Sequence, residues 1–206
     1  MDHCLKKMSL FLKILKWVSI TIVVGFAVLV VYRMFYFLDL KKTNEQVARI
    51  HATHLTLNDV MGENLPPDPG ADADKTVQGI DANHNGIRDD VELAIFKEYP
   101  ASAKTRAVLL QYALTLQMEV VQIMVNEGTV IAAVQEESRA FVCIGDIVSR
   151  KDPKFDEKTD ALTNFIKKRQ LNTQERKTTR TGFYDKINSY ESLDRVCDID
   201  YSKLPN

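Results

Sequence analysis

A short stretch between residues 81 and 92 carries oxygen-bearing side chains at a spacing that suits a metal ion. With Asp81 as position 1, these side chains occupy positions 1, 3, 5, 9 and 12, and Gly86 stands at position 6. Calcium takes six to eight oxygen ligands at about 2.3–2.6 Å. Alternate residues of a tightly curled loop can supply them together, and glycine permits the sharp turn that a Cβ would resist. The candidate ligands are Asp81, Asn83, Asn85, the main-chain carbonyl of Ile87, Asp89 and Glu92.

These twelve residues resemble an EF-hand calcium loop and are also similar to the single loops of dockerins and thrombospondin type-3 repeats. The resemblance implies that Asp89 binds directly or through water and that Glu92 gives both oxygens from the first turn of a helix. Upstream, Pro69 and Gly70 disfavour the entering helix of an EF-hand. Arg88 replaces the usual apolar residue at position 8, and no second loop occurs in the 206 residues. We therefore expect a lone loop that fixes the start of a helix, not a paired calcium sensor.

The alternative is a turn that binds nothing, because Asn, Asp and Gly favour turns for their own reasons. A turn by itself would not require carboxylates at positions 9 and 12. The presence of Asp89 and Glu92 there therefore favours a calcium site. With three carboxylates and neutral Asn at positions 3 and 5, we expect a Kd of roughly 10⁻⁴–10⁻³ M, as in extracellular modules. Such a site fills where calcium is abundant, outside the cytosol. His84 at position 4 is expected to point away from the metal, at the surface.

An apolar segment, residues 17–38, is long enough to form a membrane-spanning helix. About 20 apolar residues cross a bilayer core, and Arg33 lies near one end, where it can snorkel to the interface. A cleaved signal peptide is the rival interpretation. The bulky residues 32–35 that follow the apolar run lack a small-x-small cleavage pattern. We expect an uncleaved signal-anchor, with residues 1–16 as a cytoplasmic tail.

The three cysteines fall on both sides of this segment. The basic residues that flank it barely indicate an orientation, but calcium and cysteine chemistry favour export of the C-terminal part. In an oxidising compartment Cys143 and Cys197 can form a disulfide, while Cys4 stays reduced inside. Closing a loop of about 55 residues would stabilise the domain by roughly 4 kcal/mol. Two separate buried thiols are the alternative.

Helical periodicity without strand-like alternation predicts an all-α fold: a transmembrane helix followed by a small helical bundle with one calcium loop. Within the bundle we expect helices over about 89–99, 101–125, 130–148, 156–170 and 172–190. Gly128 is expected as a C-cap in the hairpin between the second and third of these. The expected division is a cytoplasmic tail (1–16), an anchor (17–38), a juxtamembrane helix (39–57), an extended and exposed Pro-rich acidic linker (58–80), the calcium loop (81–92), and a bundle with a C-terminal tail (93–206).

Several side chains have a structural and a functional interpretation. The histidines His51 and His54 are expected to be polar helix residues, since two ligands make a poor zinc or copper site. A basic region near the end is expected to be a solvated face, with anionic lipid headgroups or an acidic partner as the functional alternative. Nucleic acid is a poor partner for an exported domain. The basic residues are Lys167, Lys168, Arg169, Arg176, Lys177, Arg180 and Lys186.

Composition is ordinary, with a net charge of −1 and 45% hydrophobic residues. No nucleophile elbow, zinc-protease motif, phosphate loop or dinucleotide fingerprint is present, so no enzyme class is indicated. The order of anchor, linker, calcium loop, helices and two cysteines resembles small uncharacterised envelope proteins of Gram-negative bacteria. That resemblance implies a single-pass inner-membrane protein whose C-terminal domain is periplasmic. We expect a non-enzymatic calcium-binding module with an unknown envelope protein as partner; the alternative is a calcium-responsive signalling protein.

Overall fold

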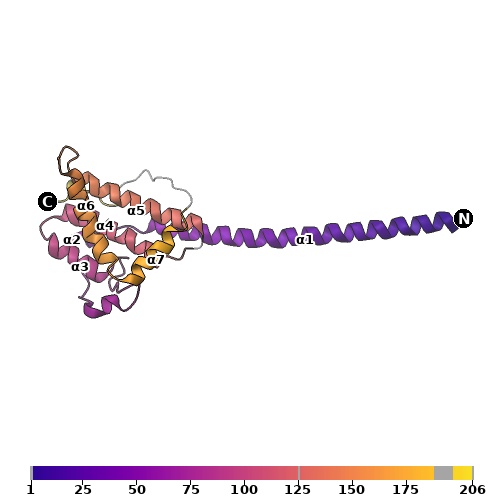
Figure 1. Cartoon of the computed structure of the whole chain (residues 1–206), viewed down its shortest axis with the longest axis horizontal. Helices are drawn as coiled ribbons and strands as arrows, with labels where there is room; N and C mark the ends of the chain where they lie inside the picture. The colour runs from indigo at the N-terminus through magenta and orange to yellow at the C-terminus, as the bar shows by residue number, and fades with distance from the viewer. Residues whose placement is uncertain (1, 125, 188–196, 206) are drawn as a thin grey trace. The chain divides into compact units, whose positions relative to one another are not determined.

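The computed structural model describes residues 2–124, 126–187 and 197–205, with the backbone alone for residues 2–11. These residues form seven α-helices, two short 3-10 helices and no strand, which confirms the all-α prediction (Figure 1). The chain divides into two compact units, Met1–Asn44 and Glu45–Asn206, and each is described by itself.

The first unit consists of most of α1, which runs from Asp2 to Ala52. Its apolar side chains between Trp17 and Leu38 are exposed, and by length and composition the helix could cross a membrane. We expected separate helices over 17–38 and 39–57. Instead α1 is continuous, because residues 39–44 include no Gly or Pro that would break it, and it stops at Ala52.

The stretch 58–80 is mostly exposed, as expected for a linker, but it is not extended throughout. Helix α2, Leu57–Met61, begins at a capping box in which Thr56 Oγ1 accepts from Asp59 N (3.3 Å) and the Asp59 carboxylate accepts from Thr56 N (2.8 Å). Gly62 ends α2 with a φ of 79°. A 3-10 helix, η1, covers Gly70–Asp74. Leu57, expected at the end of one helix, therefore begins the next.

Helix α4 is the centre of the second unit. It packs against α2, α3, α5, α6, α7 and the 3-10 helix η2, and Figure 1 shows it surrounded by other helices. Even polar side chains of α4 are therefore buried, including Gln111, Thr115 and Glu119. The bounds are α3 Asp89–Glu98, α4 Ala103–Val121, α5 Glu127–Ile147, α6 Phe155–Gln170, α7 Gln174–Tyr184 and η2 Tyr201–Lys203.

The predicted boundaries of α5 and α7 need correction. Gly128 is not a C-cap but lies in the first turn of α5, because the Asn126 side chain caps that helix by accepting from Gly128 N (3.0 Å). Helix α7 follows an N-cap at Thr173 and ends at Tyr184; the predicted continuation over 188–190 lies outside the described residues. Phe141 of α5 is 45% exposed, although its helical spacing from the buried residues Val134 and Ile144 would place it on the inner side.

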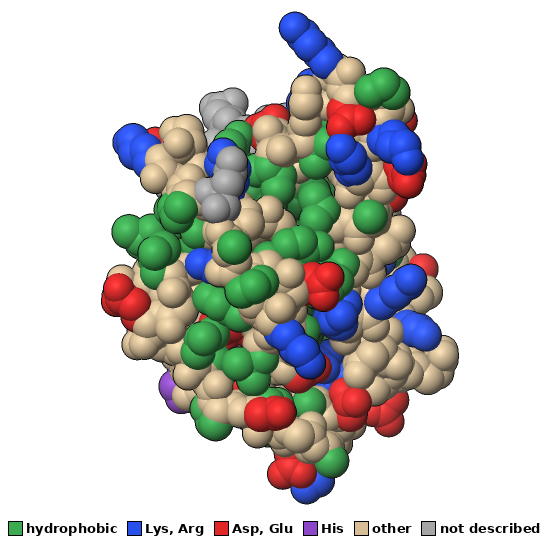
Figure 2. All heavy atoms as spheres, turned by 90° about the vertical axis from the view of Figure 1, so that its left-hand side faces the viewer, with side chains coloured by type: hydrophobic (Ala, Val, Ile, Leu, Met, Phe, Trp, Pro, Cys, Tyr) green, Lys and Arg blue, Asp and Glu red, His purple; other side chains and the backbone are tan. Residues whose placement is uncertain are grey.

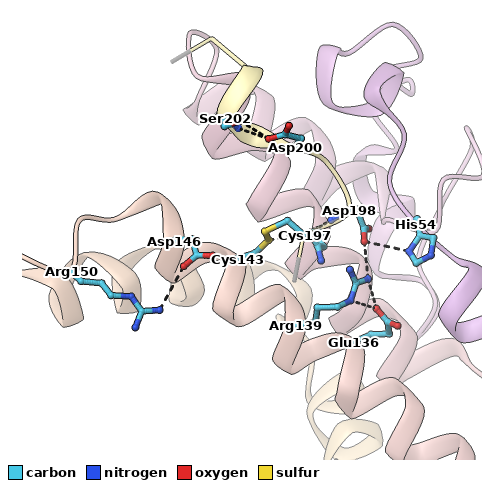
Figure 3. The surroundings of a disulfide bond; sticks show 11 residues. His54, Glu136, Arg139, Cys143, Asp146, Arg150, Cys197, Asp198, Asp200 and Ser202 are labelled. Carbon is cyan, nitrogen blue, oxygen red and sulfur yellow. Dashed lines mark hydrogen bonds and ion pairs between the residues drawn. A yellow bond between two sulfur atoms is a disulfide. The ribbon is translucent and has the colours of Figure 1, made fainter. Parts of the chain in front are cut away.

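The predicted disulfide is present. It joins Cys143 of α5 to Cys197 in the C-terminal segment, with 5.6 Å between the Cα atoms (Figure 3). Cys143 has no exposed surface. The bond therefore holds the C-terminal segment against the buried side of α5.

Two fully buried arginines hold segment 73–77, which precedes the candidate calcium loop. Arg176 donates to the carbonyls of Ala73 (2.6 Å), Thr76 (2.9 Å) and Val77 (2.9 Å), and to the Asp74 carboxylate (2.6 Å). Arg88 has no exposed surface either. It donates to the carboxylate of Asp90 (2.6 Å) and to the carbonyl of Gln170 (3.1 Å). The expected solvated basic face is thus wrong for Arg176, which is an internal residue.

We predict that Arg176→Ala lowers the free energy of unfolding by about 3 kcal/mol, because it removes the donor to three carbonyls and a carboxylate. Urea denaturation followed by circular dichroism measures the loss. Lys177→Ala, at the exposed neighbouring position of α7, should change stability by less than about 0.5 kcal/mol. Equal losses in the two variants would contradict the structural role of Arg176.

Candidate metal centre

The predicted ligands meet where the loop 81–88 runs into α3. Asp81, Asn83 and Asn85 are partly buried, whereas the Asp89 and Glu92 side chains at the start of α3 are almost completely buried. Figure 1 shows the loop leading directly into α3. The side chain of Ile87 is part of the hydrophobic core and fixes the end of the loop.

The loop is curled by hydrogen bonds from its own backbone to its side chains. The Asp81 carboxylate accepts from Asn85 N (3.2 Å) and Gly86 N (3.0 Å), and Asn85 Oδ1 accepts from Ile87 N (2.9 Å). The φ angles of His84 and Gly86 are positive, at 58° and 83°. His84 is exposed, as predicted. The side chains of positions 1, 3 and 5 all line the same cavity, as does His84.

Contacts between side chains connect this turn to α3. Asn83 Nδ2 donates to Glu92 Oε2 (3.1 Å), and Ala82 N donates to the Asp89 carboxylate (3.0 Å). Asn83 Nδ2 also donates to the carbonyl of Asn64 (2.9 Å), which lies just after α2. The segment after α2 therefore lies against the loop, a contact that the sequence did not predict.

Two buried atoms of the loop have no hydrogen-bond partner, namely Asn83 Oδ1 and Asn85 Nδ2. A buried amide oxygen without a donor is unfavourable, and such an oxygen is a ligand that calcium prefers. Among the described residues, no three His, Cys, Asp or Glu side chains form a metal-binding group by themselves. The candidate ligand atoms include the oxygens of two side-chain amides and one backbone carbonyl in addition to the carboxylates. This oxygen-rich set fits a hard divalent cation.

Carboxylate groups predominate among the titratable side chains around the loop. Burial raises the pKa of Glu92 to about 7, and the negative charges of Asp59 and Asp89 add to the increase, whereas the neighbouring amides of Asn83 and Asn85 lower it. Burial also raises the pKa of Asp89. An open cavity of about 640 Å³ lies over the loop, and its lining includes Asp59 and Asp81 but no Lys or Arg. The lining also includes His54 and His84. A cation bound here would offset carboxylate charge that no Lys or Arg in the lining compensates.

Arg88, at loop position 8, does not line the cavity over the loop. Its contacts with Asp90 and the carbonyl of Gln170 join the loop to the end of α6. Burial lowers the pKa of Arg88. The sequence indicated that this arginine disfavours the pairing strand of an EF-hand, and the described residues contain no strand.

A second polar cluster joins α4, α5 and α7, and sequence reasoning missed it. Arg180 donates to Glu119 (2.6 Å) and Glu137 (3.1 Å). Tyr184 Oη lies 3.1 Å from Glu119 and also contacts Glu137. Tyr184 has one hydroxyl hydrogen for two carboxylates, so a proton on Glu119 would complete the second contact. Burial, followed by the negative charge of Glu137, raises the pKa of Glu119 to about 8.

No signal in the sequence could have identified these clusters, because their members lie far apart along the chain. Arg180 was assigned to a solvated basic face, yet it donates to the buried carboxyl group of Glu119. Similarly, His51 lies 2.7 Å from Glu136, and His54 lies 3.3 Å from Asp198. The histidines therefore pair with carboxylates of the second unit.

No protein-family model, curated protein or solved structure matches the chain. The interpretation of the candidate centre therefore depends on its own residues and geometry.

We predict that Gly86→Ala destabilises the fold by about 1–3 kcal/mol, because its φ of 83° is unfavourable for other residues and its Cβ would lie 2.7 Å from Leu114 Cδ1. Gly182→Ala is the matched control, since a Cβ at that position of α7 meets nothing within 4 Å. It should be neutral or stabilise by up to about 1 kcal/mol. Urea denaturation compares the two. A neutral Gly86→Ala would show that the loop does not need this turn.

The pH dependence of stability should reveal the proton held by Glu119. A carboxyl group with a raised pKa in the folded state stabilises the fold at low pH, and this contribution is lost as pH rises from about 4.5 through about 8. Glu119→Gln should therefore reduce the decline in the free energy of unfolding between pH 5 and pH 9 by about 2 kcal/mol. Glu157→Gln on α6, where the side chain is 72% exposed, should not change the decline. Parallel profiles for the wild type and Glu119→Gln would contradict the assignment.

Proposed function

We propose that this chain is a membrane-anchored, extracytoplasmic, non-enzymatic module whose helical domain is stabilised by one calcium ion. The proposed ligands are Asp81, Asn83, Asn85, the carbonyl of Ile87, Asp89 and Glu92. The observation that carries the proposal is the curled loop, which gathers these groups and leaves Asn83 Oδ1 buried without a donor.

Calcium supplies the positive charge that the lining of the loop lacks. The loop would hold it through oxygens, and Glu92, in the first turn of α3, would join the ion to the bundle. A ligand that binds only the folded state stabilises it by RT ln(1 + [L]/Kd). The role of the ion is thus structural: it fastens the segments on either side of the loop.

The disulfide and α1 support the proposed location. A disulfide persists in oxidising compartments, which favours export of the domain that contains Cys143 and Cys197. We propose that α1 is an uncleaved anchor in the inner membrane and that the second unit is periplasmic.

The exposed surface supports a role in protein interaction. Figure 2 shows a face on which hydrophobic side chains gather over the middle, with charged side chains around them. Such surfaces often mark interaction sites. We propose an envelope protein as the partner.

A calcium-responsive signalling role is the second candidate. One observation favours it: Ala52, Thr53 and His54, at and just after the end of α1, line the same cavity as the loop residues. A change in the loop could therefore reach the end of α1. Helical circular dichroism and partner pull-down, each with and without calcium, distinguish the two roles. A large rearrangement without unfolding favours signalling.

We predict that calcium at about 100 times its Kd raises the melting temperature of the full chain in detergent micelles by about 5–10 °C, equivalent to about 2.7 kcal/mol. Asp81→Ala and Glu92→Ala should each lower the melting temperature and abolish its dependence on calcium, because each removes a carboxylate ligand. Differential scanning calorimetry with calcium or chelator measures both effects.

The control is Asp72→Ala, which removes an exposed carboxylate that pairs with Lys75 outside the loop. It should retain the full calcium response. If both loop variants respond to calcium as the wild type does, the proposed site is rejected.

A further inference from the structure

Asp198 connects the disulfide to the end of α1. It follows Cys197 directly, and its side chain is 1% exposed. Its backbone N–H donates to Gln111 Oε1 of α4 (3.0 Å). The disulfide and this hydrogen bond together determine where the Asp198 carboxylate lies.

The carboxylate of Asp198 binds groups from two other segments. One oxygen accepts from Leu55 N (3.0 Å), just after the end of α1. The other accepts from Arg139 of α5 (2.7 Å) and lies 3.3 Å from His54 Nδ1. Figure 3 shows Asp198 between His54 and Arg139, next to the disulfide.

The same arginine continues the network to α1. Arg139 donates to Glu136 (2.9 Å), and Glu136 lies 2.7 Å from His51 Nδ1. The side chains of Arg139, Glu136 and Asp198 are each at most 3% exposed. Because the Leu55 N–H and the Arg139 guanidinium are buried, water is a poor substitute for the Asp198 carboxylate. The end of α1 therefore depends on a residue that the disulfide holds in position.

We propose that the Cys143–Cys197 disulfide is a redox-controlled latch for the end of α1. In the oxidised state it holds Asp198 on Leu55, His54 and Arg139. An external dithiol reduces it by giving two electrons and two protons; the S–S bond breaks, two thiols form, and the dithiol becomes a disulfide. The C-terminal segment then loses its covalent bond to α5, and Asp198 releases His54 and Leu55. This proposal does not depend on calcium.

Hydrogen–deuterium exchange of the full chain in detergent micelles tests the latch. Reduction should make the amides of residues 51–56 exchange at least about tenfold faster, while α3 keeps its protection. The double variant Cys143→Ser/Cys197→Ser should behave like the reduced wild type and should not respond to reductant.

Two single variants separate the role of Asp198 from that of the disulfide. Asp198→Ala should accelerate exchange over 51–56 with the disulfide intact, because it removes both acceptor oxygens. Asp200→Ala, two residues further on, should have no effect there, since Asp200 is exposed and bonds Ser202 and Lys203. Unchanged exchange at 51–56 after reduction would overturn the proposal. So would loss of protection throughout the domain, because the disulfide would then support the whole fold and not this segment.

Discussion

Buried charge requires a partner, and this constraint organises the second unit. Arg176 is paired with Asp74, Arg139 with Glu136 and Asp198, and Arg180 with Glu119 and Glu137. The Arg139–Glu136 pair lies within α5. The other pairings join segments that are distant in the sequence. The carboxylates around the loop differ from these groups, because no Lys or Arg lines their cavity. A bound cation would give these carboxylates a positively charged partner, as the arginines do for the other buried carboxylates.

The sequence predicted what depends on local patterns. The twelve-residue spacing predicted the turn at Gly86 and the helix that starts at Asp89, and both are present. Helical periodicity predicted the helices and the hairpin of α4 and α5, because apolar residues on one face need neighbours to cover them. The cysteine count and the expected compartment predicted the pairing of Cys143 with Cys197.

Contacts between distant segments could not be predicted. The linker was expected to be extended because its Pro and Gly residues disfavour long helices. Its order comes from Arg176, about 100 residues away. Helix ends depend on which of several nearby residues acts as the cap. Asn126 caps the start of α5, so Gly128 lies inside that helix and is not a C-cap. At the candidate site the sequence predicted the side chains of the loop. It did not predict the contact with Asn64, because Asn64 lies outside the twelve-residue pattern.

The end of α1 lies next to both the candidate site and the network around Asp198. It lies beside the cavity of the loop, and it is held by Asp198 and Glu136. Residues 51–55 are thus next to the candidate site and are held by carboxylates of α5 and of the disulfide-linked C-terminal segment. The most direct test of the central claim is calcium titration of the full chain by isothermal titration calorimetry. The account predicts one ion per chain with a Kd of roughly 10⁻⁴–10⁻³ M; no binding at millimolar calcium, or equal binding after Glu92→Ala, would contradict it.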